Sequence, residues 1–591
     1  MNELLDQAEA AMRQGRFAEA RSTIEQALGQ GLDTHQQSEA RSMLGLAMVA
    51  TGEAAAALDH LNAAVAAEPA EAMFRYNLGR GLEAVGDAGG AVRELREAVR
   101  LAPGMMPLEV ALAQVLLRTG NAGEARGLLE SHAADPQAPA DVTRMLVQAQ
   151  AGVGDTHAAL DTARRLLPPD LNTGTGPYAA QQRVDVMSAA SLAHAAMHYE
   201  ESAQMVRALL ERNPSDAEAA TLLGQLLLWM QGPEAAREVL ASAQAAGARS
   251  PRLLVDLIAL DGDEQAIARA KAELGDSNLP DSDRIDLLLA LAQYQDRAGT
   301  ADLAWDLASQ GKALLAAGEQ RDWPALLERQ RQLCRETQSV ASLSGGPQHL
   351  YLLGLPRSGQ SLVQSVLAAA PDISSVGERG ALLQHLLFRE KDIVAMPAGQ
   401  RRALLHELSQ ADRRGIQRLV GAPEWIVDKS PLHLSIAGNV AKVHPEARFA
   451  AVLRDPADVA VSIWLRRFPP VYDYTNDFKD LLDHIEFAID ALAAWRRDGI
   501  DIRIIDFERF VAQPEVTGKA LFDWLGVEWS AAYLDPQSRT EPVPTYSAAQ
   551  VRQPVGKGGG HGAQPYAERL APFAQRLSRI REKQAGLLPG E

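Results

Sequence analysis

LGLPRSGQSL (residues 353–362) follows a short apolar run and precedes a segment with a helical pattern. Gly354 and Gly359 have the G-x-x-x-x-G spacing of a Walker A phosphate-binding loop, and Ser361 stands at its Ser/Thr position. Gln360 replaces the lysine that reaches the β- and γ-phosphates in such a loop. The stretch therefore predicts a loop for a phosphorylated ligand, but one that differs from the loop of triphosphate-using enzymes.

Apolar runs alternate with helical patterns in the remainder of the chain. We expect buried strands at 350–355, 448–456 and 502–510, and helices at 361–371, 457–468 and 519–529. This alternation is typical of an α/β domain with a mostly parallel sheet, whose ligands bind at the carboxyl ends of its strands. The segment 467–478, which contains two tyrosines and a proline pair, is expected to be a surface loop.

The position of the loop at a helix N-terminus favours an anion, because backbone N–H groups and the helix dipole point toward it. Arg357 supplies a cation whose forked guanidinium matches a tetrahedral oxyanion. The sequence contains no convincing pair of magnesium-holding residues, which transfer from a triphosphate would need. We therefore expect the loop to hold a monophosphate-type end group.

Glycines recur every 34 residues in the N-terminal part, at Gly52, Gly86, Gly120 and Gly154. This period resembles that of the tetratricopeptide repeat family, whose unit is a helical hairpin. The resemblance implies an all-α superhelix with a concave face. Two roles stay open for it: docking of a peptide, substrate protein or second subunit, and packing or dimerisation without a ligand.

The chain is expected to be multidomain, because 591 residues are too many for one core. We assign residues 1–338 to the helical array, with an interruption near 168–182 and irregular units in its second half. Residues 339–349, rich in Ser and Gly, are the predicted linker. Residues 350–591 are the predicted P-loop-like α/β domain.

The whole net charge of −18 belongs to residues 1–350, because acidic and basic residues are equal in number from Tyr351 onward. This acidity argues against nucleic acid as a partner and fits a basic or neutral protein better. Cys334 is the only cysteine, so no internal disulfide is possible, which fits a reducing compartment. We see no signal-peptide pattern and no apolar run of membrane-spanning length, and expect a cytoplasmic protein. The oligomeric state stays open.

Five blocks between about 348 and 575 resemble sulfotransferases, in the family's order. GLPRSGQSLVQSVLAAAPD (354–372) resembles their 5′-phosphosulfate loop, and AVLRDPADVAVS (451–462) resembles their 3′-phosphate motif. WIVDKSPLHLSIAGNVAKVHPEARF (425–449), IIDFERFVAQPEVTGKALFDWLGVEW (504–529) and YSAAQVRQPV (546–555) resemble the tyrosylprotein-sulfotransferase branch. A tetratricopeptide array before such a domain is a familiar bacterial arrangement.

The resemblance implies sulfuryl transfer from 3′-phosphoadenosine 5′-phosphosulfate, without a metal. The implied ligands of the 5′-phosphate are Pro356, Arg357, Ser358, Gly359, Gln360 and Ser361, and those of the 3′-phosphate are Arg454, Ser462 and Arg466. The matches to the C-terminal segment that closes over the donor are Ser547, Arg552 and Lys557. The alternative for Arg454 is an ion pair with Asp455 or Asp458. Phe507 stands where the branch usually has a tyrosine.

The same match suggests three catalytic residues. Lys429 would stabilise charge on the leaving phosphate, or would instead pair with Asp428. Glu378 falls where the branch places its catalytic carboxylate and would take the acceptor proton, with His433 as the rival base. The branch often has two adjacent acids here, but Arg379 follows Glu378 in this chain.

The favoured interpretation is a sulfotransferase whose repeat array recruits the acceptor or a partner protein. The resemblance favours a peptide tyrosine as the acceptor, and a glycan, lipid or small metabolite is the alternative. A second interpretation is a repeat-based interaction scaffold whose domain binds nucleotide without turnover. A third, a kinase of the P-loop type, is opposed by the missing lysine and magnesium ligands.

Overall fold

The computed structural model describes residues 3–135, 137–171, 173, 176, 178–315, 321–341, 346–379, 382–421, 423–535, 555 and 562–588. Contacts divide the chain into two compact units, Met1–Ala208 and Leu209–Glu591. The domain boundaries expected at 338 and 349 stay predictions.

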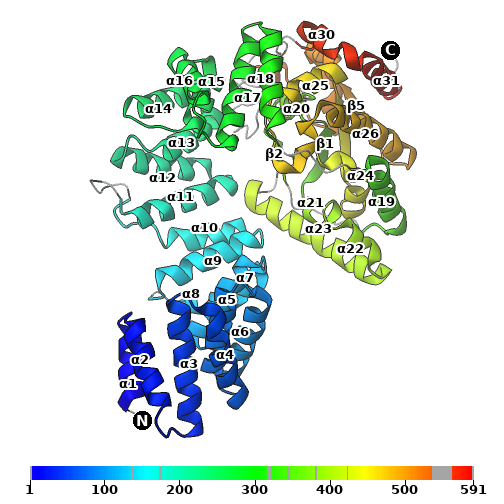
Figure 1. Cartoon of the computed structure of the whole chain (residues 1–591). Helices are drawn as coiled ribbons and strands as arrows, with labels where there is room; N and C mark the ends of the chain where they lie inside the picture. Colours follow the sequence, from blue (N-terminus) through cyan, green and yellow to red (C-terminus); the bar gives the residue numbers. More distant parts are fainter. Residues whose placement is uncertain are drawn as a thin grey trace. The chain divides into compact units, whose positions relative to one another are not determined.

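The first unit is a series of helical hairpins (Figure 1). Its helices are α1 (Glu3–Arg13), α2 (Phe17–Leu28), α3 (Thr34–Ala50), α4 (Ala54–Ala67), α5 (Ala72–Ala84), α6 (Ala88–Leu101), α7 (Met106–Arg118), α8 (Ala122–Ala133), α9 (Ala140–Gly152), α10 (Thr156–Arg164) and α11 (Ala180–Ala195), while α12 (Tyr199–Arg212) crosses into the second unit. Gly52, Gly86, Gly120 and Gly154 each turn the chain within one hairpin, with φ between 79° and 88°. Glycine adopts this left-handed conformation without steric cost, so the structure confirms the helical repeat and explains its phased glycines.

Helices of the second unit approach each other at glycines, as the paired helices of the first unit do. A Cβ on Gly45 would lie 2.5 Å from Leu61 Cγ, and a Cβ on Gly224 would lie 2.9 Å from Leu240 Cγ, sixteen residues further on in both cases. The helices of this part are α13 (Ala217–Met230), α14 (Pro233–Ala245), α15 (Pro251–Asp261), α16 (Glu264–Leu274), α17 (Asp281–Arg297), α18 (Ala301–Ala313) and α19 (Trp323–Glu336). Irregular sequence in the second half of the array therefore still folds into paired helices.

The remainder of the second unit is built around a five-stranded parallel sheet with the order β2-β3-β1-β4-β5. Its elements are β1 (Gln348–Gly354), α20 (Gln360–Leu367), β2 (Ile373–Gly377), α21 (Leu383–Leu386), α22 (Glu390–Ala395), α23 (Ala398–Val420), β3 (Trp425–Asp428), α24 (His433–Val443), β4 (Arg448–Leu453), α25 (Pro456–Trp464), η1 (Pro470–Asn476), α26 (Phe478–Arg497), β5 (Ile502–Asp506), α27 (Phe507–Ala512), α28 (Pro514–Leu525), η2 (Ala531–Leu534), η4 (Gln564–Tyr566), α30 (Ala567–Leu570), η5 (Ala571–Phe573) and α31 (Ala574–Ala585). The predicted α/β class and parallel sheet are confirmed.

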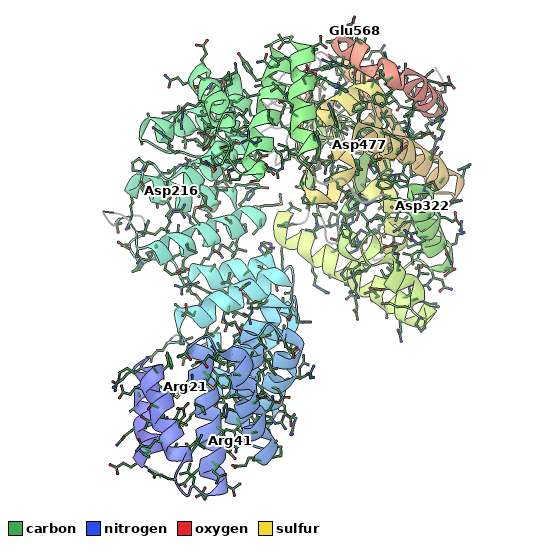
Figure 2. All side chains as sticks on the ribbon, viewed as in Figure 1. Arg21, Arg41, Asp216, Asp322, Asp477 and Glu568 are labelled. Atoms are coloured by element: carbon green, nitrogen blue, oxygen red, sulfur yellow. The ribbon has the colours of Figure 1, made fainter. Side chains whose placement is uncertain are left out.

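Both faces of the sheet are covered, as the apolar runs of its strands require. Leu350 and Leu352 of β1 join one core with α20 and α28. Tyr351 and Leu353 join the other core with α24, α25 and α26. Helices begin at capping aspartates, among them Asp216, Asp322 and Asp477, labelled in Figure 2, whose carboxylates accept from N–H groups in the first turns of α13, α19 and α26.

Several local expectations differ from the structure, and some predicted bounds are too long: β4 ends at Leu453, α20 at Leu367 and α25 at Trp464. The predicted strand 502–510 ends at Asp506, because the Asp506 carboxylate accepts from Arg509 N and starts α27. The segment 467–478 is not a simple surface loop: it forms η1, with Tyr472 and Tyr474 buried. Strands β2 and β3 were not predicted, because they are only five and four residues long, and neither contains an apolar run of four residues.

The last helices before the sheet share a core with the α/β elements. Trp305 of α18 lies 5.7 Å from Trp464 and 5.1 Å from Phe478, measured between ring centres. In α19, which falls within the range predicted for the array, Gln330 receives a 2.7 Å hydrogen bond from the amide of Asn439 in α24. Helices α17 to α19 therefore support the sheet domain directly. No helix in the described ranges has both the length and the apolar character needed to cross a membrane.

Lys312 of α18 is buried at this junction. Its Nζ donates to Thr475 O at 2.8 Å and lies 5.6 Å from the ring centre of Trp464. Burial lowers the pKa of Lys312 to about 7. A lysine in the unfolded chain keeps its proton up to a pH of about 10.4. Between about pH 7 and 10.4 the unfolded state therefore binds more protons than the folded state. The free energy of unfolding consequently rises with pH over this range.

We expect Lys312→Met to unfold at a higher temperature than wild type at pH 6, and this advantage to shrink by roughly 1 kcal/mol per pH unit between pH 7 and 10. Thermal unfolding followed by circular dichroism across this range measures the difference. Lys479→Met, at an exposed position of α26 paired with Asp483, is the control and should show no such trend. A pH-independent difference between Lys312→Met and wild type would contradict the lowered pKa.

Candidate active site

The loop between β1 and α20 has a backbone conformation that needs glycine at two positions. Gly354 and Gly359 have φ of 151° and 103°, and Arg357 between them has a φ of 68°. A Cβ on Gly354 would lie 2.9 Å from Val452 O in β4, and a Cβ on Gly359 would overlap the ring of Phe507. The two predicted loop glycines are therefore required by close contact with β4 and with the start of α27.

The other loop residues differ in what they can offer a ligand. Pro356 and Ser358 are buried, and Ser358 Oγ has no hydrogen-bond partner among the described residues. The side-chain amide of Gln360 donates to Leu352 O at 2.8 Å, so it is committed to β1. Gln360 and the half-buried Ser361 still contribute first-turn N–H groups of α20, which have no partner within the helix.

Three arginines converge where β1 and β4 end. Arg357 Nε donates to Ser462 Oγ at 3.1 Å, and Arg466 Nη1 approaches the same oxygen at 3.2 Å. Arg454 Nη1 donates to Arg357 O at 3.4 Å. Burial lowers the pKa of Arg357, and the charges of Arg466 and Arg454 lower it further; burial also lowers the pKa of Arg466 to about 10. Mutually repelling, partly desolvated cations form a strong site for an anion.

The positions of Arg466 and Arg454 refine the sequence expectations. Helix α25 ends at Trp464, so Arg466 lies beyond the helix, and its side chain folds back to donate to Ser462 O at 2.7 Å. The ion pair that was the alternative for Arg454 is present, and it forms with Asp458, at 3.2 Å. Its guanidinium also stands 5.2 Å from the ring centre of Phe507. Phe507 stands where the resemblance leads us to expect a tyrosine, and the face of its ring contacts the Arg454 guanidinium.

Glu378 and Lys429 lie at the ends of the neighbouring strands β2 and β3. Lys429 Nζ donates to Glu378 Oε1, so the lysine pairs with Glu378 and not with Asp428. The Lys429 side chain is 4% exposed and the Glu378 side chain is 41% exposed. The carboxylate is thus the member of the pair that can meet an acceptor from solvent.

His433, the rival base, is buried at the start of α24. Its ring packs edge-on against Tyr351, and its Nδ1 lies 3.5 Å from Asp428 Oδ1. Burial lowers the pKa of His433 to about 4 and raises the pKa of Asp428. A histidine with 1% of its surface exposed cannot contact an acceptor without rearrangement, so this placement counts against His433 as the base.

One supporting pair was missed by the sequence analysis. Arg379 Nη2 donates to Asp412 Oδ1 at 2.8 Å, and Asp412 in α23 is 3% exposed. The sequence analysis noted Arg379 only because the branch often has a second acid at this position. Its ion pair with Asp412 anchors the chain directly after Glu378. Asp412 belongs to no motif, because its role depends on the packing of α23 beside β2.

The structure thus brings the phosphate loop, the three arginines, Glu378 and Lys429 to the carboxyl edge of one sheet. The predicted residues Ser547, Arg552 and Lys557 lie outside the described residues.

Comparison with known proteins defines the class of each part. The model of the sulfotransferase family matches residues 349–531, a range that holds all of β1 but its first residue, β2 to β5 and the site just described. The tetratricopeptide repeat model matches residues 5–72, 42–105 and 76–139. The chain therefore carries tetratricopeptide repeats in its N-terminal region and a sulfotransferase-family domain in its C-terminal region, as the sequence motifs predicted.

Particular relatives are distant. The chain is 21% identical over 408 residues to an uncharacterized protein of Aquifex aeolicus, covering 64% of this chain and 52% of that protein. It is 26% identical over 196 residues to protein-tyrosine sulfotransferase 1 of Danio rerio, covering 31% and 55%. It spans about half the length of these curated relatives. A solved sulfotransferase domain from the curacin biosynthetic pathway is 15% identical, with a TM-score of 0.28, and covers 42% of this chain and 99% of that domain.

We expect Gly359→Ala to destabilise the protein and to abolish binding of adenosine 3′,5′-bisphosphate, because the new Cβ displaces Phe507 and the loop. Gly526→Ala is the matched control: Gly526 also has a positive φ, 78°, but no atom lies within 4 Å of its Cβ position. Both variants lose roughly 1–2 kcal/mol from backbone strain. Thermal unfolding and calorimetric titration compare them, and equal effects of the two substitutions would contradict the packing role of Gly359.

Proposed function

We propose that the C-terminal domain transfers a sulfuryl group from 3′-phosphoadenosine 5′-phosphosulfate to a hydroxyl group of an acceptor. The observation that carries this proposal is the convergence of Arg357, Arg454 and Arg466 around Ser462 and the phosphate loop. Several cations in one site suit a nucleotide with phosphates at two positions. The sulfotransferase-family match supports the identity of the transferred group.

The residues fit this donor. Gly354 and Gly359 let the loop pack directly against β4 and Phe507, and the buried Ser358 Oγ lacks a hydrogen-bond partner among the described residues. Arg357 and the first-turn N–H groups of α20 would hold the 5′-phosphate. The residues that would hold the 3′-phosphate are Arg454, Ser462 and Arg466.

The donor supplies an activated sulfuryl group on its 5′-phosphate. Lys429 would stabilise the negative charge that the phosphate oxygen gains as its bond to sulfur breaks. Glu378 would accept the proton that the acceptor hydroxyl loses as its oxygen bonds to sulfur. In this arrangement Lys429 acts on the leaving side and the more exposed Glu378 acts on the acceptor side.

A peptide tyrosine is the acceptor we favour, because the Danio rerio and Drosophila melanogaster relatives are protein-tyrosine sulfotransferases. A glycan, lipid or small metabolite is the alternative. The repeat array would recruit the acceptor or a partner protein, as tetratricopeptide repeats generally mediate protein interactions. A cytoplasmic location is also proposed, supported by the single, buried Cys334. The scaffold interpretation differs in predicting nucleotide binding without turnover.

Calorimetry with adenosine 3′,5′-bisphosphate tests the donor site. We expect wild type to bind with a dissociation constant on the order of micromolar, and Arg454→Ala to bind at least about thirtyfold more weakly, because a buried charge contact to phosphate is lost. Arg497→Ala, exposed at the end of α26, is the matched control and should bind like wild type. Absence of binding by wild type would contradict the proposed donor.

Turnover of labelled donor with phenolic and tyrosine-peptide acceptors tests the base. We expect Glu378→Gln to lower kcat by about 10²–10⁴, with little change in bisphosphate affinity, because only proton transfer is removed. Lys429→Met should also lower kcat. His433→Asn should retain most of the activity, and an equal loss in His433→Asn would oppose Glu378 as the base. Binding without any turnover in wild type would favour the scaffold.

A further inference from the structure

The C-terminal segment 562–588 lies beyond the family match, which ends at residue 531, yet it is bonded to the turn between β4 and α25. Arg581 of α31 forms a two-pronged ion pair with Asp455: its Nε lies 2.7 Å from Oδ2 and its Nη2 lies 3.0 Å from Oδ1. Asp455 is the N-cap of α25, since its Oδ1 also accepts from Ala457 N at 2.9 Å. Arg581 therefore braces the carboxylate that starts this helix.

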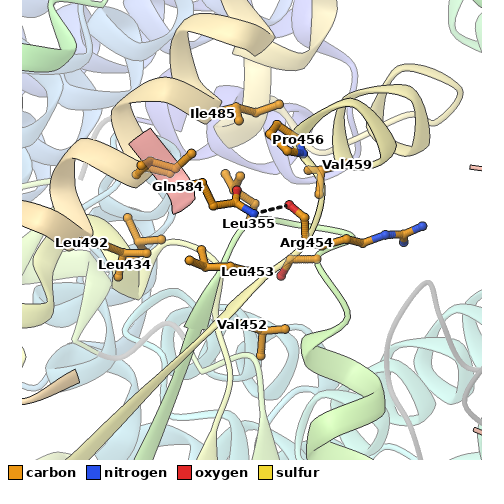
Figure 3. A pocket seen from close by; sticks show the side chains of 13 residues that line it. Leu355, Leu434, Val452, Leu453, Arg454, Pro456, Val459, Ile485, Leu492 and Gln584 are labelled. Atoms are coloured by element: carbon orange, nitrogen blue, oxygen red, sulfur yellow. Dashed lines mark hydrogen bonds between the residues drawn. The ribbon is translucent and has the colours of Figure 1, made fainter. Parts of the chain in front are cut away.

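Two more hydrogen bonds reach the same turn. The side-chain amide of Gln584 donates to Arg454 O at 3.2 Å, and Figure 3 shows this bond with the Arg454 guanidinium pointing away from the apolar pocket behind it. Ala563 N donates to Asp458 Oδ1 at 2.7 Å, and Asp458 is the ion-pair partner of Arg454. Backbone and side chain of Arg454 are thus both constrained by the C-terminal segment.

The segment itself is firmly held. On one side, Tyr566 donates to Asp296 of α17 at 2.7 Å, and Arg569 pairs with Asp302 and Asp306 in the first two turns of α18. On the other side, basic residues of α31 pair with acidic residues of α26, in the pairs Arg576–Asp483, Arg579–Glu486 and Lys583–Asp490. The segment 562–588 is therefore fixed to α17 and α18 through η4 and α30, and to α26 and the turn between β4 and α25 through α31.

We propose that Arg581 and Gln584 of α31 are positioning residues that aim Arg454 at the 3′-phosphate of the donor. This inference rests on the proposed function, because it takes Arg454 as a ligand of that phosphate. Neither residue touches the donor; they fix the backbone from which Arg454 extends. Loss of both contacts lets the turn relax, so the arginine spends less time in the geometry that a charge-assisted hydrogen bond needs.

The test compares two double variants of the full chain, each with one Arg→Gln and one Gln→Ala substitution in α31. Arg581→Gln/Gln584→Ala removes both contacts to the turn. Arg579→Gln/Gln575→Ala, at exposed positions, removes the Arg579–Glu486 pair but neither contact to the turn. Calorimetry measures adenosine 3′,5′-bisphosphate, and displacement measures adenosine 5′-phosphate, which lacks the 3′-phosphate. We expect the first variant to bind the bisphosphate about tenfold more weakly and the monophosphate nearly as wild type does.

The control should bind both nucleotides like wild type, and Arg581→Lys should bind the bisphosphate within about threefold of wild type, because it keeps a cation beside Asp455. Equal weakening for both nucleotides would show a general structural role and overturn the inference. Unchanged bisphosphate affinity in Arg581→Gln/Gln584→Ala would overturn it as well, with the proposed function left intact. No bisphosphate binding by wild type would instead overturn the proposed function, and this inference with it.

Discussion

The pairing of β1 with β4 is the constraint on which the candidate site depends. Their parallel register sets Gly354 beside Val452, so the phosphate loop and the Arg454 turn leave the sheet at adjacent positions. Arg357 and Ser462, 105 residues apart in sequence, thereby come within 3.1 Å. Neither segment alone brings all three arginines together, and the sheet joins the two segments at its carboxyl edge.

Gathering three arginines has an electrostatic cost, which the surrounding structure limits. Asp458 pairs with Arg454, and the ring of Phe507 lies beside the same guanidinium. Asp455, held by Arg581, places another carboxylate just behind this turn. The guanidinium groups of Arg357 and Arg466 meet at Ser462 Oγ, and the ion pair of Asp458 with Arg454 offsets part of the positive charge.

Helices α18 and α19, which precede the sheet in the chain, have a structural function in the sheet domain. Trp305 of α18 packs against Trp464 and Phe478, and Trp323 of α19 stacks on Phe487 at 5.0 Å. Burial of these large rings removes apolar surface of both the helices and the sheet domain from water. The last helical pair is therefore part of the body that carries the site, and removal of it would expose an apolar core.

The sequence by itself determined the features that depend on neighbouring residues: the 34-residue glycine phase, the loop glycines, the strands around Leu353 and Leu453, and the arginines that follow them. The resemblance to sulfotransferases also suggested Glu378 and Lys429, and the structure brings both to the same edge of the sheet. Only the tertiary structure decided that Lys429 pairs with Glu378, that His433 is buried, that α19 packs on α24, and that α31 braces the Arg454 turn. These outcomes depend on strand order and on contacts between residues distant in sequence, and no local pattern encodes which distant side chain will fill a given space.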